Sequence, residues 1–389
     1  MKLRFLVVFS MAATLGHAAE PFLTHTDVFK SGEEGYAGYR IPAVVTASDG
    51  SLVALLEGRK DNKSDPGGGD IDLVMKRSED NGLTWSKLVV VDDPGEKWSA
   101  SNPSLVVDRT GARIWLAFNR WKPGKGSANS RPGSDDCQSW LRWSDDMGRT
   151  WSAARDITKE ARDYERWGSM FFGPGGAIQT KSGRLVLPAA MCPDTCKVMG
   201  GTTGWAGSLE LMRPYTVFSD DHGKTWQRSE LVQALADENQ VVELADGAVM
   251  MDLRQGNGDR RYIALSRNEG SQWSWPTLGQ TVTAVATSIE RFSLKAAGGD
   301  RNRLLWTGPD GPGRRHLVVR VSYDEGQTWT NQKTLSGGIA AYSDITVLKD
   351  GTVGVLWERG VTETSQFVTF TRFNREFVEP PGTFVPEWK

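Results

Sequence analysis

The sequence has little of what several common enzyme classes need. Its 389 residues include only three cysteines, Cys137, Cys192 and Cys196, which are too few for a disulfide scaffold and lack zinc-finger spacing. The four histidines form no HExxH pair, which leaves little for a histidine-built metal site. The GxSxG motif of a serine hydrolase is also absent. The sequence therefore gives no support to a disulfide-rich domain, a zinc peptidase or an α/β-hydrolase.

A strong charge of one sign is missing as well. The 46 basic and 48 acidic residues give a formal net charge of -2. Without a large net charge the protein has no long-range field to gather nucleic acid or an anionic membrane, so we expect no nucleic-acid partner. With 39% hydrophobic and 24% charged residues, the chain is instead typical of a globular protein with a full core.

Long hydrophobic runs are absent, and only the N-terminus has features of a targeting segment. Lys2 and Arg4 precede a short apolar run and a small-residue stretch that ends in GHA at 16–18. Because charge, apolar run and small-x-small site follow the order of a secretory signal, residues 1–18 are predicted to be a cleaved signal peptide. No later run approaches the ~20 apolar residues of a membrane span, so no integral membrane segment is expected.

We therefore expect a secreted or periplasmic protein, and export bears on the cysteines. Cys192 and Cys196 lie close together in CPDTC and could form a small disulfide in an oxidising compartment. Cys137 would then be left unpaired. Two free thiols in a loop remain the alternative.

A repeated octapeptide is the most obvious feature present. The form S-x-D-x-G-x-T-W occurs at 78–85, 144–151, 219–226 and 322–329, with a worn copy, SRNEGSQW, at 266–273. Its aspartate can accept hydrogen bonds from turn amides, its glycine can take a positive φ, and its tryptophan can bury a large ring. Near-identical turn chemistry at so many places indicates a structural unit rather than a set of calcium ligands or catalysts.

Short alternating strands on either side of a glycine turn form a second repeat. Five copies are well formed, for example YRIPAVVTASDGSLVALLEGR and YSDITVLKDGTVGVLWE, and ERFSLKAAGGDRNRLLW is a weaker one. Each predicts a β-hairpin. The six turn glycines are Gly50, Gly111, Gly183, Gly247, Gly299 and Gly351, and one octapeptide falls in each of the five gaps between them.

This alternation predicts an all-β fold. Each unit is long enough for a four-stranded antiparallel sheet, and six such sheets around an axis make a six-bladed β-propeller. We expect residues 19–389 to be one such domain, with the last sheet completed by strands from both chain ends, which hides exposed edges. A pair of β-sandwiches is the alternative, but it explains neither the alternation nor the spacing.

The hairpin register brings polar residues to one end of the sheets. In the five well-formed hairpins, positions nine residues before the turn glycine, or ten before Gly50, should face positions seven residues after it at the open end of the hairpin. The facing pairs are Arg40 with Glu57, Asn102 with Phe118, Pro174 with Ala190, Glu238 with Arg254, and Tyr342 with Glu358. A single arginine or glutamate would most simply be an exposed ion pair. Several at one register predict a site where the strands of a propeller converge.

The motif YRIP at 39–42, together with the four well-formed octapeptides, resembles the sialidase (neuraminidase) family, of the bacterial exo-α-sialidase type. The resemblance covers essentially the whole mature chain. Its specific part is the arginine of RIP, the EGR that follows, and the late tyrosine and glutamate. It implies a six-bladed propeller, which matches the count above, and hydrolysis of terminal sialic acids without a metal or cofactor. The implied partners are sialylated glycoproteins, glycolipids or oligosaccharides.

The resemblance implies a set of substrate-binding residues. A clamp of three arginines for the sugar carboxylate falls on Arg40, Arg254 and Arg314. Arg315 is the fallback for the third, because GRRHL permits either. Arg59 matches a further family arginine near the acid/base loop.

The same resemblance implies the catalytic residues. The acid/base aspartate falls on Asp65 in a glycine-rich loop, with Asp61 and Asp70 as rivals. The nucleophile matches Tyr342, and the base behind it matches Glu238.

Two further positions complete the comparison. Glu358 matches the glutamate that braces the first clamp arginine. Where many family members have an aspartate before PS, this chain has Asn102, so the polarity of the pocket near the acid loop should differ. We still expect Asn102 to contact the substrate.

The chemistry of sialic acid accounts for these residue types. Its carboxylate sits on the carbon where the glycosidic bond is broken, and guanidinium groups can hold it while keeping their charge at any working pH. A carboxylate nucleophile would be repelled by that group, whereas a tyrosine is not. With a reference pKa of ~10, Tyr342 needs a base such as Glu238. Asp65 would protonate the leaving oxygen and later deprotonate water.

Other functions remain open on the sequence alone. A propeller glycosidase acting on neutral glycans through two carboxylates would need no arginine clamp. A glycan-binding propeller without catalysis would keep the octapeptides but need not keep Tyr342 or Glu238. The aspartates at 61, 65, 70 and 72 could also bind calcium or simply solvate a turn. The convergent arginines favour the exo-sialidase.

Overall fold

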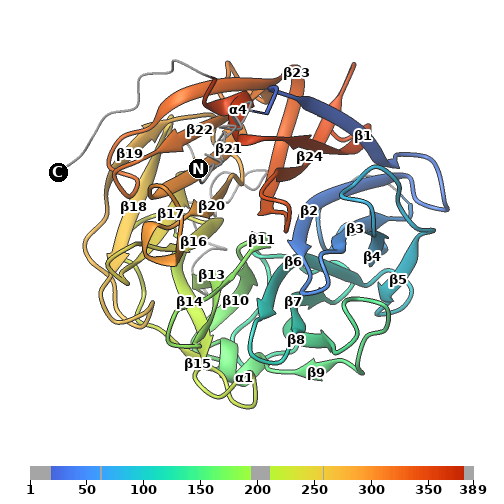
Figure 1. Ribbon diagram of the computed structural model, residues 1–389. Helices are drawn as coiled ribbons and strands as arrows, with labels where there is room; N and C mark the ends of the chain where they lie inside the picture. The colour runs from blue at the N-terminus through green and yellow to red at the C-terminus, as the bar shows by residue number, and fades with distance from the viewer. Residues whose placement is uncertain (1–18, 62–63, 194–210, 257, 381–389) are drawn as a thin grey trace, which may run out of the picture.

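The computed structural model describes residues 19–61, 64–193, 211–256 and 258–380 (Figure 1). This part of the chain is all-β apart from two one-turn helices, α1 (Thr158–Ala161) and α4 (Arg375–Val378), and a short 3-10 turn, Lys295–Ala297. None of its helices is long and apolar enough to cross a membrane. The predicted signal peptide, residues 1–18, lies outside the described residues.

The strands hydrogen-bond mainly to their neighbours in sequence, in antiparallel fashion. Figure 1 shows the resulting sheets placed as a ring, with the chain running round it from blue to red. The first two groups are β2 (Gly38–Thr46), β3 (Leu52–Arg59), β4 (Ile71–Ser78) and β5 (Val89–Asp92), then β6 (Ser99–Asp108), β7 (Arg113–Trp121), β8 (Cys137–Ser144) and β9 (Arg155–Asp156).

The next two groups follow round the ring. One contains β10 (Trp167–Phe172), β12 (Ile178–Gln179), β13 (Leu185–Pro193), β14 (Arg213–Ser219) and β15 (Gln227–Arg228). In sequence, β11 (Gly175–Gly176) lies between β10 and β12, but it pairs in parallel with β6 of the preceding group. The other group contains β16 (Asn239–Glu243), β17 (Val249–Arg254), β18 (Arg260–Ser266) and β19 (Thr277–Thr281).

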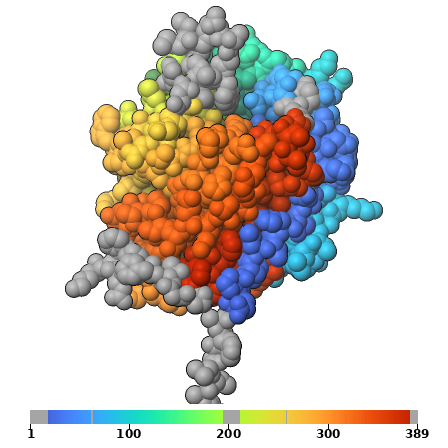
Figure 2. Space-filling model, turned by 90° about the horizontal axis from the view of Figure 1, so that it is seen from above, coloured from blue at the N-terminus to red at the C-terminus, as the bar shows by residue number. Residues whose placement is uncertain are grey.

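The last strands form one continuous sheet that includes both ends of the described chain. Its strands are β20 (Ser288–Ser293), β21 (Arg303–Pro309), β22 (Arg315–Ser322), β23 (Thr330–Val347), β24 (Val353–Gly360), β25 (Phe367–Phe373) and β1 (Leu23–Lys30). The long β23 pairs with β22 through its first part and with β24 through its second. The N-terminal strand β1 pairs with β25, so the expected closure by the two chain ends is confirmed. Figure 2 shows the blue N-terminal segment lying along the red C-terminal one.

Each octapeptide folds as the predicted turn and packs against a neighbouring sheet. In the first copy, the Thr84 amide and hydroxyl both donate to Asp80, at 2.9 and 2.6 Å. Gly82 has φ +86°, and a Cβ there would collide with the ring of Phe370 in β25. The ring of Trp85 packs edge-on to the same phenylalanine at 5.3 Å. The octapeptide therefore joins one sheet to the next, and this packing supports the structural role expected of it.

The six predicted hairpins are present, but some details of their turns differ from the prediction. Gly50 and Gly351 take the positive φ of a tight turn, at 92° and 79°. In the second hairpin the left-handed residue is Ala112 rather than Gly111. In the weak copy, the left-handed residue is Gly298 rather than Gly299.

The register predicted for the third hairpin is wrong. Ala190 is paired with Phe171 of β10, not with Pro174. Pro174 has no amide hydrogen for a sheet ladder. After it the chain turns away to place Gly175 beside Ser104 of β6. An aromatic residue therefore occupies the position at which the sequence suggested proline.

Aliphatic and aromatic side chains between adjacent groups form the core. One cluster joins Val53 and Leu55 of β3 to Leu105 and Leu116 of the next group, all with no exposed surface. Burial of this kind is the main source of stability, at roughly 25 cal/mol per Å² of apolar surface. The sheets are therefore fixed relative to one another, which keeps the strand ends at the site in place.

Two of the three cysteines lie in the described residues. Cys137 is buried and free, and burial raises the pKa of its thiol to about 11. Cys192 is disulfide-bonded. Cys196, the partner that the sequence offers, lies outside the described residues.

Candidate active site

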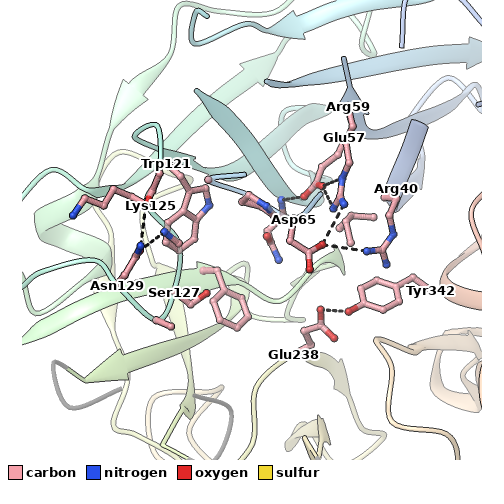
Figure 3. A pocket seen from close by; sticks show the side chains of 18 of the residues that line it. Arg40, Glu57, Arg59, Asp65, Trp121, Lys125, Ser127, Asn129, Glu238 and Tyr342 are labelled. Atoms are coloured by element: carbon pink, nitrogen blue, oxygen red, sulfur yellow. Dashed lines mark hydrogen bonds and ion pairs between the residues drawn. The ribbon is translucent and has the colours of Figure 1, made fainter. Parts of the chain in front are cut away.

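A cavity of about 540 Å³ collects side chains from several strand groups (Figure 3). Most of the polar residues predicted from the sequence line it, namely Arg40, Glu57, Arg59, Asp65, Asn102, Glu238, Arg314 and Tyr342. Residues separated by some 300 positions in sequence thus share one site. In Figure 3, Asp65, Arg40, Tyr342 and Glu238 point toward one another.

Three of the strands carry a β-bulge where they deliver a residue to the cavity. The register shifts between Arg40 and Ala43 in β2, between Ser101 and Ser104 in β6, and between Ala340 and Ser343 in β23. Ile41, inside the first bulge, has φ +60°, which is strained for a β-branched residue. A bulge re-aims side chains at a strand end, and these bulges turn Arg40, Asn102 and Tyr342 into the cavity.

Arg40 is held between two carboxylates. Its Nε and Nη2 donate to the two oxygens of Glu358 at 3.1 and 3.3 Å, and Nη1 donates to Asp65 at 3.3 Å. The Ile41 amide also donates to Glu358, at 2.9 Å. Burial lowers the pKa of Arg40, but the charges of Glu358, Tyr342 and Asp65 and the hydrogen bond to Glu358 together outweigh burial, so the net shift is upward. Glu358, with no exposed surface, therefore fixes the direction of this guanidinium.

Arg59 and Glu57 form a second, buried pair on β3. Arg59 Nη2 donates to Glu57 at 2.7 Å, and its Nη1 donates to Asp65 at 3.2 Å. The Asn102 amide donates to the other oxygen of Glu57 at 3.0 Å. Burial raises the pKa of Glu57, although the charge of Arg59 opposes the shift. This pair links the bulge at Asn102 to the loop that carries Asp65.

Tyr342, Glu238 and Arg254 make a buried triad. The Tyr342 hydroxyl donates to Glu238 Oε1 at 2.5 Å and accepts from Arg254 Nη1 at 3.0 Å. Arg254 also donates to Glu238 Oε2. Burial raises the pKa of Tyr342, and the charge of Glu238 raises it further, while the nearby arginines lower it. The phenol is therefore neutral at rest, with the Glu238 carboxylate in contact with its proton.

The triad agrees with the sequence register only in part. Arg254 meets Glu238, as the hairpin count predicts. Tyr342 and Glu358 share one end of their hairpin, but their side chains have different partners: Glu358 bonds Arg40 of the next group, and Tyr342 bonds Glu238.

The structure separates the candidate residues that the sequence left open. Arg314 lines the cavity with its guanidinium 5.5 Å from the Tyr342 ring centre, whereas Arg315 is exposed at the start of β22. Asp65 lines the cavity, while Asp70 pairs with Lys60 at 3.1 Å. Asp61 is exposed and does not line the cavity.

Other lining residues carried no sequence signal. Trp121 and Phe171 form an aromatic wall, and the segment from Gly124 to Asn129 forms the far side of the cavity. Asp237, which precedes Glu238, was likewise not predicted from the sequence. It is fully buried, 3.8 Å from Arg254 Nη1, and burial raises its pKa.

Comparisons with known proteins identify the class. A family model described as a BNR repeat-like domain matches residues 50–355. A sialidase of Micromonospora viridifaciens is 33% identical over 360 residues, which are 88% of this chain and 53% of that protein. A sialidase of Bacteroides fragilis is 27% identical over 354 residues, 85% of this chain and 62% of that protein. This chain thus spans a little over half the length of these relatives.

Solved structures of sialidases have a similar fold. The Hadza microbial sialidase Hz136 has a TM-score of 0.79 and 26% identity, covering 90% of this chain and 68% of that one. A Trypanosoma rangeli sialidase solved with sialic acid shares the fold, with a TM-score of 0.71, 19% identity, and coverage of 91% and 59%. The protein is therefore an all-β BNR-repeat protein. It belongs to the BNR repeat-like family, and the relatives and solved structures that it resembles are sialidases, as its motifs suggested.

The contacts of Arg254 lead to a prediction about stability. Replacing Arg254 with alanine leaves Glu238 and Asp237 buried beside each other without their shared cation. Removing one partner of a buried ion pair typically costs about 3–5 kcal/mol. We expect the free energy of unfolding in urea to fall by about this amount. Arg315→Ala, at an exposed arginine, should leave it unchanged, and equal stability of the two variants would contradict the buried pairing.

Proposed function

We propose that this chain is a retaining exo-α-sialidase that hydrolyses terminal sialic acids on glycoproteins, glycolipids or oligosaccharides. One observation carries the proposal: Arg40, Arg254 and Arg314 all reach Tyr342, whose hydroxyl contacts Glu238. Such a cluster of guanidiniums beside a phenol suits an acidic sugar. The curated relatives named sialidases support the same conclusion.

The arginines would bind the sugar carboxylate. Arg40 and Arg314 lie 5.1 and 5.5 Å from the Tyr342 ring centre, and Arg254 donates to its hydroxyl. A carboxylate above the phenol can accept hydrogen bonds from all three, and charge-assisted bonds of this kind are the strong ones. The anomeric carbon, which carries that carboxylate, then lies beside the Tyr342 oxygen.

In the first step, Tyr342 attacks. Glu238 takes the phenolic proton while the Tyr342 oxygen bonds to the anomeric carbon and the glycosidic C–O bond breaks. Asp65 gives its proton to the departing oxygen. In the second step, Asp65 takes a proton from water, whose oxygen bonds to the same carbon while the bond between that carbon and the Tyr342 oxygen breaks, and Glu238 returns its proton to the released Tyr342 oxygen. Two displacements at one carbon preserve its configuration.

The substrate would also prepare Asp65. Its carboxylate is 56% exposed and is held by Arg40 and Arg59 at 3.3 and 3.2 Å. A bound sugar carboxylate competes with Asp65 for Arg40. Losing that contact allows Asp65 to turn toward the leaving oxygen.

The strand pairing supports the finer architecture that we propose, a six-bladed propeller formed by residues 19–389. Four groups have their own strands, and the seven-stranded sheet divides at β23 into two sets of four that share this strand. Export through a signal peptide at residues 1–18 remains a prediction.

The alternatives fit the cavity less well. A glycosidase for neutral glycans would have no use for three convergent cations, and the carboxylates Glu238 and Asp65 are both engaged by arginines. A binding protein would have no need of a tyrosine held against a buried base. Asp70 and Asp72 bond Lys60, which accounts for two of the aspartates considered as calcium ligands.

The test is turnover of an aryl α-sialoside by the purified protein, with the matching aryl β-galactoside as control. We expect free sialic acid to appear from the first and no hydrolysis of the second. Proton NMR should show the α-anomer as the first product, before mutarotation. Release of the β-anomer first would rule out the two-step mechanism, and absence of turnover would reject the proposed function.

A further inference from the structure

Two short segments meet at the edge of the cavity. We call residues 64–70, which carry Asp65, the acid segment, and residues 122–130, which form the far wall, the bracket segment. We propose that Ser99 and Gly67 are positioning residues that lock the acid segment to the bracket segment and so hold Asp65 at the leaving-group oxygen. The inference rests on the proposed function, in which Asp65 is the acid.

Ser99 forms hydrogen bonds with two backbone groups of the acid segment. Its hydroxyl donates to the Gly69 carbonyl at 2.8 Å and accepts from the Gly67 amide at 2.9 Å. Ser99 has no exposed surface, and as the first residue of β6 it lies beside Ile71 of β4. A rigid strand therefore fixes the middle of the acid segment through one hydroxyl group.

Gly67 brings the two segments into backbone contact. Its carbonyl accepts from the Gly124 amide at 3.0 Å. Its φ is +88°, and a Cβ at this position would collide with the carbonyl oxygen of Lys125. Backbone atoms cannot move aside as a flexible side chain can, so any side chain at Gly67 must push the segments apart.

The Asp70 end of the acid segment is held separately. The Lys60 amide donates to the Asp70 carbonyl at 2.9 Å, and Lys60 Nζ contacts Asp70 and Asp72 at 3.1 and 3.0 Å. The Asp65 side chain is itself more than half exposed. Loss of the central contacts would therefore shift Asp65 without releasing the segment from the fold.

A displaced acid has a specific kinetic effect. A sugar hydroxyl is a poor leaving group and needs the proton, whereas an activated phenol leaves readily without it. General acid catalysis contributes typically 10²–10⁴-fold. Misplacement of Asp65 should therefore slow cleavage of a sialyl-galactoside far more than cleavage of a nitrophenyl sialoside. A general loss of folded protein would lower both rates equally.

The experiment measures kcat/KM of Ser99→Ala and Gly67→Ala on sialyllactose and on 4-nitrophenyl α-sialoside. We expect losses on the order of 10² on sialyllactose for both variants and less than about threefold on the aryl substrate. Gly247→Ala is the matched control, because Gly247 also has a positive φ, 84°, but no atom lies within 4 Å of its Cβ position. It should be wild-type on both substrates.

Each outcome supports or contradicts the positioning role of Ser99 and Gly67. Equal losses on the two substrates, or no loss on sialyllactose, would overturn the positioning role. Should Gly67→Ala fail to fold in a thermal melt, Ser99→Ala alone carries the test, since it removes only a hydroxyl. Absence of turnover by the wild-type protein would instead reject the proposed function.

Discussion

Replacing Tyr342 with phenylalanine is expected to lower kcat on an aryl α-sialoside by about 10⁴-fold, because it removes the atom that we propose forms the covalent intermediate. That factor corresponds to about 5.4 kcal/mol of transition-state stabilisation. The ring should stay in place, since it packs with Ile41, Val285, Ala286 and Ala341. Glu238 and Arg254 would also keep each other as partners. KM should therefore change little, and thermal unfolding should confirm an intact fold.

Tyr215 offers a matched control for this substitution. It is fully buried and donates its hydroxyl to the Ala161 carbonyl at 2.7 Å, outside the cavity. Tyr215→Phe removes the same atom and a buried hydrogen bond, so it should cost about 1 kcal/mol of stability. Its kcat should equal that of wild type. A Tyr342→Phe variant with more than a tenth of wild-type kcat would contradict the assignment of the nucleophile.

The sequence could predict much of the site because strand register is strict. Side chains alternate with a period of two, so counting from a turn glycine identifies which residues share a strand end. This is how Arg40 is placed beside Glu57, and Glu238 beside Arg254, in agreement with the register and contacts of the structure. The register alone assigns no catalytic or binding role to these residues; those roles come from the family resemblance.

The count could not predict departures from regular pairing. The bulges at Ile41, Asn102 and Tyr342 depend on contacts with other sheets, such as the bond from the Ile41 amide to Glu358. The third hairpin was misplaced for a related reason. Close approach of Gly173 to the Asn239 backbone, and the pairing of Gly175 with β6, divert that chain from its own hairpin.

A periodic pattern cannot predict which loop residues line the cavity. The sequence alone does not show whether Arg314 or Arg315 reaches the cavity, because that depends on where β22 begins. The role of the bracket segment could not be predicted from the sequence either, because its contacts with the acid segment are backbone hydrogen bonds whose partners are set by the fold. Asp237 could not be predicted from the sequence, because a buried acid next to Glu238 has no motif of its own.

The three arginines of the proposed clamp differ in how far the protein neutralises them. Arg40 is paired with Glu358 and Asp65, and Arg254 with Glu238 and Asp237. Over the described residues, no ion pair or side-chain hydrogen bond of Arg314 is found; its contact is with the Tyr342 ring. Arg314 therefore supplies the positive charge that an incoming carboxylate can most readily use. Its removal also leaves no buried acid without a partner.

Arg314→Ala is accordingly expected to reduce kcat/KM on an aryl α-sialoside by about 10³-fold, the effect of losing a charged hydrogen-bonding partner worth about 4 kcal/mol. The free energy of unfolding should stay within about 0.5 kcal/mol of wild type, as for other substitutions away from buried networks. Arg315→Ala is the matched control: it removes the same side chain one residue away, on an exposed strand end, and should keep full activity. If Arg315→Ala were the inactive variant, the third clamp arginine would be Arg315. If both variants were fully active, binding of the substrate carboxylate would have to depend on Arg40 and Arg254 alone.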